Sequence, residues 1–146
     1  IKKTTGKDIT NYPGAGAAGG MGGGLLAFFN AELKPGTELL LKAIDFSEKI
    51  KGADLIITGE GKADQQTAMG KVPYGILKEA QKEHIPVIVL AGSIENLPEL
   101  NKAGFKGIFS IAPGPITLEK AMEPEFAKEN ITRLVSQLYS VITSFG

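Results

Sequence analysis

The stretch TGEGKADQQTAMGK, residues 58–71, holds the side chains of this chain that are best suited to chemistry. Its charged members Glu60, Asp64 and Lys71 stand between glycines and follow a short apolar run. Carboxylates bind Mg²⁺ or accept a hydroxyl proton, and a lysine neutralises an anion. These residue types suit phosphoryl transfer, a reaction that depends on positioning and on charge neutralisation.

Roles for these residues follow from their chemistry as hypotheses. Asp64 and Lys71 are the candidate catalytic residues, Asp64 as the acceptor of a hydroxyl proton and Lys71 as the partner of a phosphate or carboxylate. Glu60 is the candidate ligand of Mg²⁺. The remaining candidates for contact with substrate or phosphate in this stretch are Gly59, Gly61, Gln66 and Thr67.

The same residues have a simpler explanation, because charged side chains between glycines are also typical of a solvated surface loop. Lys62 is the residue most readily explained in that way. His84, the single histidine, precedes Ile85 and Pro86 and is expected at a helix end rather than in catalysis. On residue types alone, both explanations of the stretch stay open.

A second candidate site is the glycine-rich stretch PGAGAAGGMG, residues 13–22, which contains the pattern G-x-G-x-x-G. A dinucleotide fingerprint requires a strand just before the first glycine, and residues 7–13 do not have the pattern of a buried strand. The Walker pattern is absent because valine follows Gly70 and Lys71. Glycines at a helix start are costly, so the backbone is expected to approach either an anion or another segment closely. The candidate anion contacts are Gly14, Gly16, Gly19, Gly20 and Gly22.

The elements that must position these residues alternate between strand and helix. Apolar, β-branched runs predict buried strands at residues 53–58, 86–90 and 107–111. Helical spacing predicts helices at residues 73–83 and 95–103 and a long amphipathic helix at 124–145. This alternation indicates an α/β fold, a Rossmann-like parallel sheet flanked by helices, with ligands at the carboxyl ends of the strands. Three strands are few for such a sheet, so we expect further strands to come from elsewhere.

The first half of the chain is less regular. Residues 25–31 have the pattern of the end of a buried helix, with residues 25–29 inside, and residues 38–44 have that of another helix. We therefore divide the chain at residue 50. Residues 1–50 hold the glycine-rich ligand loop and helices, as part of a second domain, and residues 51–146 form the Rossmann-like portion.

Composition excludes several functions for these 146 residues. The 16 basic and 16 acidic residues give a formal net charge of zero, whereas nucleic-acid-binding surfaces usually carry a basic excess. The absence of cysteine excludes disulfides and thiolate metal sites, and a single histidine excludes a histidine-rich site. No apolar run approaches the length of a membrane span, so we expect no membrane partner and a cytoplasmic location.

Several motifs, taken together, are more specific than any one of them. They lie at residues 13–22, 28–35, 52–61, 64–67, 70–73, 86–92 and 111–122. In this combination the chain resembles the bacterial, ATP-dependent glycerate kinase family. The resemblance implies ATP- and Mg²⁺-dependent phosphorylation of D-glycerate, to 2-phosphoglycerate more often than to 3-phosphoglycerate. It also implies a two-domain protein more than twice this length, with this chain as its C-terminal portion and the glycine stretch close to an anion.

The missing N-terminal part of the same enzyme is then an expected partner, and we expect the 146 residues alone to catalyse poorly. Two alternatives belong to other classes: a non-catalytic module that binds a small anion, and an oligomerisation module whose sheet edges pair between copies. A candidate base at Asp64 favours the enzyme, because a pure binding module has no need of one.

Overall fold

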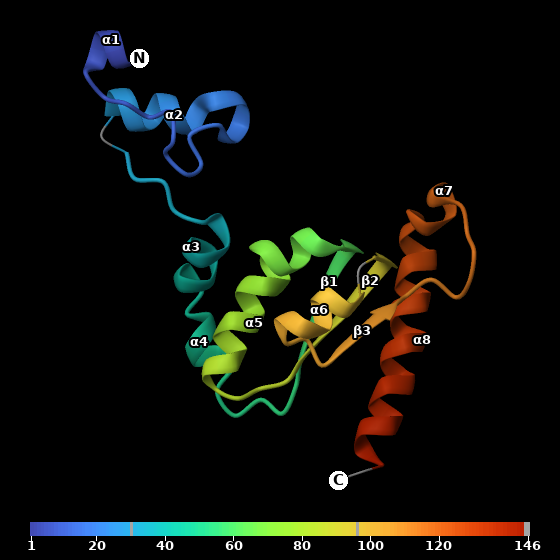
Figure 1. Cartoon of the computed structure of the whole chain (residues 1–146). Helices are drawn as coiled ribbons and strands as arrows, with labels where there is room; N and C mark the ends of the chain where they lie inside the picture. The colour runs from blue at the N-terminus through green and yellow to red at the C-terminus, as the bar shows by residue number, and fades with distance from the viewer. Residues whose placement is uncertain (30, 96, 145–146) are drawn as a thin grey trace. The chain divides into compact units, whose positions relative to one another are not determined.

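The computed structural model describes residues 1–29, 31–95 and 97–144 (Figure 1). The chain forms two compact units, residues 1–39 and 40–146, and each is described by itself. The predicted division at residue 50 refers to the domains of a longer enzyme and stays a prediction. Within the described ranges, no helix combines the length and the apolar character that crossing a membrane requires.

The second unit is built on a parallel sheet of three strands in the order β1-β2-β3. β1 spans Ile56–Ala63, β2 spans Val87–Ile94 and β3 spans Gly107–Ser110. Ile56 of β1 lies opposite Val87 of β2, and Ile88 of β2 lies opposite Gly107 of β3. The predicted α/β fold with an open parallel sheet is confirmed, because both pairs of neighbouring strands run in the same direction.

Helices α5 (Val72–Lys82) and α6 (Leu97–Ala103) connect the strands (Figure 1). Pro73 stands in the first turn of α5, where its missing N–H removes no helical hydrogen bond. Alternate residues of β2, among them Val87 and Val89, point to one face and pack in a core with Leu77 of α5 and Leu100 of α6. The short α4 (Phe46–Lys49) leads to Ile50, which also belongs to this core.

The opposite face of β2 is also covered. Ile88 and Leu90 on that face are buried, and Gly92 lines a cavity together with Asn130 of α8 (Pro124–Thr143). Burial on both faces explains why β2 is an uninterrupted apolar run in the sequence. The predicted helix at residues 124–145 is confirmed as far as residue 143, and residue 145 lies outside the described residues.

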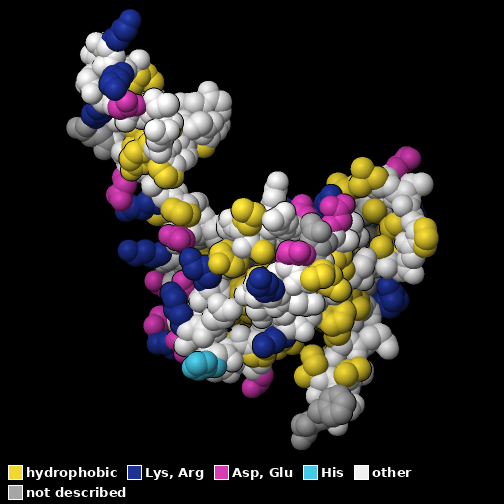
Figure 2. Space-filling view, viewed as in Figure 1, with side chains coloured by type: hydrophobic (Ala, Val, Ile, Leu, Met, Phe, Trp, Pro, Cys, Tyr) yellow, Lys and Arg dark blue, Asp and Glu magenta, His cyan; other side chains and the backbone are white. Residues whose placement is uncertain are grey.

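The C-terminal helices leave apolar side chains exposed. α7 (Leu118–Ala121) precedes α8, and hydrophobic side chains gather over this part of the surface in Figure 2. The exposed large apolar residues of α7 and α8 are Leu118, Ile131, Tyr139, Val141 and Ile142. The apolar side chains of α8 are therefore only partly covered within this chain.

The first unit contains α1 (Lys2–Thr5) and α2 (Ala17–Phe29), and α3 (Gly36–Ala43) crosses into the second unit. The predicted burial of residues 25–29 is wrong for Leu25, Phe28 and Phe29, which are exposed in this structure. Their spacing places these three residues on one face of the helix, whereas Leu26 and Ala27 share the buried face with Gly22 and Gly23. Within this unit, α2 therefore buries one of its faces and exposes the opposite one.

Candidate functional site

Glu60 lies inside strand β1 rather than in a loop. The strand predicted at residues 53–58 is shifted along the chain, because β1 begins at Ile56 and continues to Ala63. Backbone pairing explains the extension: Gly59 lies opposite Leu90 of β2 and Glu60 lies opposite Ala91. The polar residues are tolerated because β1 is an edge strand of the described sheet, with alternate side chains facing solvent. Glu60 is thereby fixed near the carboxyl end of the strand.

A capping box holds the segment that follows β1. Asp64 is the N-cap of the 3₁₀ helix η1 (Gln65–Met69), and its Oδ1 accepts hydrogen bonds from the backbone N–H groups of Gln66 at 2.9 Å and Thr67 at 3.3 Å. In return the Thr67 hydroxyl accepts a hydrogen bond from the backbone N–H of Asp64 at 3.1 Å. This exchange satisfies three backbone N–H groups at the helix start, those of Asp64, Gln66 and Thr67. Asp64 is therefore held firmly by its own segment.

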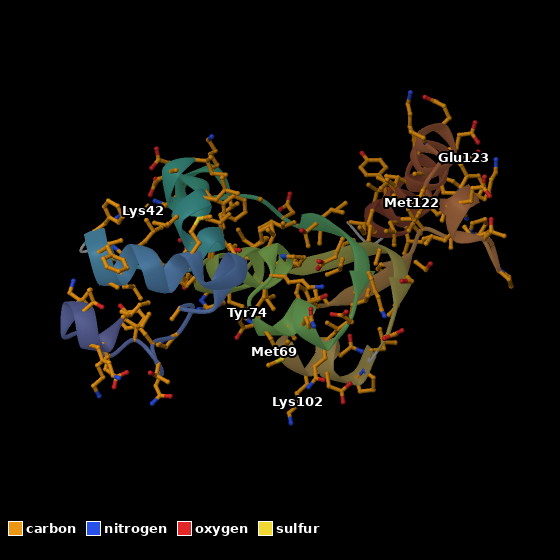
Figure 3. The ribbon with its side chains drawn as sticks, turned by 90° about the horizontal axis from the view of Figure 1, so that it is seen from above. Lys42, Met69, Tyr74, Lys102, Met122 and Glu123 are labelled. Atoms are coloured by element: carbon orange, nitrogen blue, oxygen red, sulfur yellow. The ribbon has the colours of Figure 1, made fainter. Side chains whose placement is uncertain are left out.

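Lys71 joins the two carboxylates. Its Nζ lies 3.4 Å from Glu60 Oε1 and 3.4 Å from Asp64 Oδ1. The three side chains are partly buried, with exposed fractions of 34% for Lys71, 18% for Glu60 and 21% for Asp64. Met69 is the last residue of η1, and Tyr74 lies in the first turn of α5; both are labelled in Figure 3. Lys71 lies between them in the sequence. The structure therefore brings the three predicted charged residues together as one cluster.

The charge of Lys71 acts on the ionisation of Asp64. Burial acts to raise the pKa of the Asp64 carboxyl, but the Lys71 charge and the amides of Gln66 and Thr67 outweigh it. The pKa of Asp64 consequently lies below its ordinary value of 3.8. Asp64 is ionised at neutral pH and is a weaker proton acceptor than an unperturbed aspartate.

The remaining predicted residues of this stretch differ in their exposure. Thr67 is fully buried in this structure, and its predicted contact with substrate stays a prediction. Gln66, Gly59 and Gly61 are exposed and stay available for such a contact. Lys62 is paired with Glu95 at 2.9 Å, consistent with its expected place outside the cluster.

The cluster contains oxygen ligands of the kind that Mg²⁺ binds. Two carboxylates face one ammonium, which leaves the cluster with a net negative charge that favours a further cation. Mg²⁺ takes one or two protein carboxylates and completes its coordination with water and phosphate oxygens. In the described part of the chain, no group of three or more His, Cys, Asp or Glu side chains gathers as a metal site. Carboxylate oxygens without histidine or cysteine are donors that suit Mg²⁺ better than a transition metal.

The glycine stretch, in the first unit, combines left-handed turns with tight packing. Gly14, Gly19 and Gly20 have φ values of +85°, +68° and +92°, a region that favours glycine. Gly22 is buried, and a Cβ atom there would lie 2.6 Å from the Gly14 carbonyl oxygen. This packing accounts for a glycine at position 22, and its predicted contact with an anion stays a prediction. Gly16, Gly19 and Gly20 are exposed, with open space around their Cβ positions.

A small cavity lies beside the carboxyl ends of β2 and β3. Its volume is about 30 Å³, room for about one water molecule. Its lining residues are Gly92, Ile111, Ala112, Ile116, Ala121, Phe126, Ala127 and Asn130. The cavity is mainly apolar and too small for a nucleotide base or a substrate.

The sequence profile of the glycerate kinase family matches residues 1–143, nearly the whole chain. This chain belongs to the glycerate kinase family. The protein named glycerate kinase from Halalkalibacterium halodurans is 46% identical over 124 residues, 84% of this chain and 33% of that relative. The glycerate 2-kinase of Escherichia coli K12 is 42% identical over 134 residues, 91% of this chain and 35% of that protein. The predicted resemblance is confirmed.

A solved structure supports the same family at the level of the fold. The crystal structure of a protein described as glycerate kinase 2 from Salmonella typhimurium LT2 aligns with a TM-score of 0.70 and 34% identity. The alignment covers 98% of this chain and 35% of that chain. The glycerate kinase family chain described above thus spans about one third of the length of the relatives that it matches.

The sequence did not predict the hydrogen bond between Thr67 and Glu60. Thr67 donates its hydroxyl hydrogen to Glu60 Oε2 at 3.2 Å, which links η1 to β1. The sequence carries a partial signal, because Asp64 followed three residues later by a polar side chain is a capping pattern. That pattern usually ends in Glu or Gln, so threonine at this position gave no prediction of the link.

Proposed function

We propose that this chain is the C-terminal portion of an ATP-dependent kinase that phosphorylates a hydroxyl of D-glycerate. The family match over residues 1–143 is the observation that carries the proposal. The charged cluster supports it independently, because two carboxylates and a lysine at the end of β1 are the groups that phosphoryl transfer requires. The missing N-terminal part supplies the remainder of the cleft, and the 146 residues alone turn over poorly.

Within the cluster, each side chain has a separate task. Lys71 donates hydrogen bonds to a phosphate or to the substrate carboxylate and neutralises its charge. Asp64 accepts the proton of the attacking hydroxyl. Glu60 is the residue that would hold Mg²⁺. When bound, Mg²⁺ supplies charge neutralisation at the transferring phosphoryl group.

The exposed glycines of the first unit provide the anion contacts of the proposal. Gly19 and Gly20 lie in left-handed turns without side chains, so an anion can approach their backbone closely. Gly14 and Gly16 lie in the turn directly before α2 and complete the set. Gly22 is left out because it is buried against Gly14.

For the product, we infer 2-phosphoglycerate rather than 3-phosphoglycerate. The name of the relative from Escherichia coli, glycerate 2-kinase, supports this choice. We place the enzyme in the cytoplasm, where ATP is available as its cosubstrate. Phosphorus NMR of the product distinguishes the two phosphoglycerates directly.

The first experiment measures ADP release by the full-length protein that carries this sequence. Mg-ATP is supplied with D-glycerate, L-glycerate, glycolate or tartronate in parallel reactions. Strong turnover with D-glycerate alone is the expected result, and silence with all four acids would overturn the proposal. Rapid ATP turnover by the 146 residues alone would contradict the expected need for the N-terminal part, and a size measurement in solution tests the oligomeric alternative.

A further inference from the structure

The Thr67 hydroxyl contacts the charged cluster from a buried position. Its side chain is fully buried, yet its oxygen both donates and accepts a hydrogen bond. The hydroxyl donates to Glu60 Oε2 at 3.2 Å and accepts from the backbone N–H of Asp64 at 3.1 Å. A buried hydroxyl with both functions satisfied is a fixed point in the structure.

Through this fixed point, Thr67 determines the direction of the Glu60 carboxylate. One oxygen of Glu60, Oε2, is held by the Thr67 hydroxyl, and the other, Oε1, faces the Lys71 ammonium at 3.4 Å. The same Lys71 Nζ also reaches Asp64 Oδ1. Without the hydroxyl, the flexible Glu60 side chain is free to leave Lys71, since its exposed fraction of 18% leaves it a path to solvent.

We propose that Thr67 is a positioning residue, whose hydroxyl fixes the Glu60 carboxylate for cation binding between β1 and η1. The proposal rests on the function proposed above, because it assumes that Glu60 meets the cation of the nucleotide. Thr67 itself touches no substrate, and it acts through Glu60. Loss of such a supporting hydrogen bond typically costs about 10- to 100-fold in metal affinity.

The test compares two substitutions in the full-length protein. Thr67→Val keeps the shape and removes the hydroxyl, whereas Thr67→Ser keeps the hydroxyl and removes only a methyl group. Mn²⁺ affinity in the presence of ADP is measured by electron paramagnetic resonance, and the Mg²⁺ requirement of the reaction is measured separately. We expect Thr67→Val to weaken Mn²⁺ binding about tenfold, and Thr67→Ser to stay within about threefold of the wild type.

A double-mutant cycle with Glu60→Gln decides whether Thr67 acts through Glu60. We expect Thr67→Val to add little to the loss of Mn²⁺ affinity that Glu60→Gln causes, because the group to be positioned is already gone. The same loss in both backgrounds would overturn the proposal, as would equal Mn²⁺ affinities for the valine and serine variants. If Thr67→Val does not fold, Thr67→Cys replaces it, because a thiol is a weak hydrogen-bond donor. Equal Mn²⁺ affinities of the Thr67→Cys and Thr67→Ser variants would then overturn the proposal.

The binding measurement also separates this inference from the proposed reaction. If the wild-type protein does not phosphorylate D-glycerate, yet Thr67→Val weakens Mn²⁺ binding more than Thr67→Ser does, the proposed reaction is overturned and the proposed role of Thr67 stands. If the wild-type protein phosphorylates D-glycerate but its Mn²⁺ affinity is the same with and without the Thr67 hydroxyl, the proposed reaction stands and the proposed role of Thr67 is overturned.

Discussion

A Cβ atom on Gly92 would lie 2.7 Å from the carbonyl oxygen of Gly61, on the neighbouring strand. Gly92 belongs to β2 and Gly61 to β1, directly after Glu60. The two backbones therefore meet at a point where a side chain on Gly92 has no room. The position of Glu60 depends on this close approach, because a shift of β1 away from β2 would carry its carboxylate with it.

The Gly92→Ala substitution tests this close approach. Because the obstructing atom belongs to the backbone, we expect destabilisation of about 1–3 kcal/mol, typical of overpacking. Thermal or urea unfolding of the full-length protein measures the effect. Gly114→Ala is the matched control, since Gly114 is exposed and nothing lies within 4 Å of its Cβ position. Equal stability of the two variants would contradict the steric argument.

Lys71→Met tests the ammonium at the centre of the cluster. The substitution keeps the length of the side chain and leaves Glu60 and Asp64 without their shared cation. We expect kcat/KM with D-glycerate to fall about 100-fold or more, as for other preorganised charge-stabilising groups. Lys102→Met provides the control, because Lys102 of α6 is exposed (Figure 3). A loss below about tenfold for Lys71→Met would exclude Lys71 from charge stabilisation.

The lowered pKa of Asp64 predicts a dependence of stability on pH. Its ionised form is favoured in the folded state, so its contribution is fully present above the ordinary value of 3.8. The contribution is lost as the pH falls through the lower pKa of the folded state. We expect Asp64→Asn to unfold at a lower temperature than wild type at neutral pH, with a difference that shrinks below about pH 4.

Asp54→Asn controls for the loss of an exposed aspartate outside the cluster. A difference between wild type and Asp64→Asn that stays constant from neutral to strongly acidic pH would refute this linkage. The acid limb of the rate carries the same information. If Asp64 is the base, the midpoint of any loss of rate that its protonation causes lies below pH 3.8.

Gly22 and Gly24 of α2 differ in the space around their Cβ positions, which allows a test of tight packing at Gly22. Gly22→Ala places a methyl group against the Gly14 carbonyl oxygen, so we expect destabilisation of about 1–3 kcal/mol. Gly24→Ala meets open space within the helix, and alanine there is expected to gain up to about 1 kcal/mol in helix propensity. Unfolding of the full-length variants measures both effects. Opposite signs are the expected outcome, and destabilisation by both would show that the helix tolerates no side chain on either face.

The sequence predicted the three strands and the helices α5, α6 and α8 of the second unit, because their apolar periods are strong and their ends are marked by glycine or proline. The short helices α4, η1 and α7 were not predicted. The sequence also misplaced the end of β1 because Glu60 and Lys62 are polar, and polarity alone does not distinguish a loop from an edge strand. Pairing with Leu90 and Ala91 decides the matter, and pairing is a tertiary property. For α2, helical spacing could have separated the exposed Phe28 and Phe29 from the buried Leu26.

The charged residues of the candidate site were predictable as residue types, but their mutual arrangement was not. The burial of Thr67 and Gly22 was not predicted, because burial depends on neighbouring segments that residue types do not reveal. Thr67 is polar and stands beside Asp64 in a glycine-rich stretch, features that suggest an exposed ligand contact. Its hydroxyl is instead used inside the protein, where it holds Glu60 and the amide of Asp64.

The charged cluster is drawn from one short, continuous stretch of chain. Thr67 and Glu60 are seven residues apart, as are Lys71 and Asp64, so each contact closes only a small loop. Small loops cost little entropy to close, and contacts of this kind form early when a chain folds. The arrangement of Glu60, Asp64 and Lys71 can therefore be inherited as a single segment, because one strand end, one capping box and one helix start bring all three side chains together.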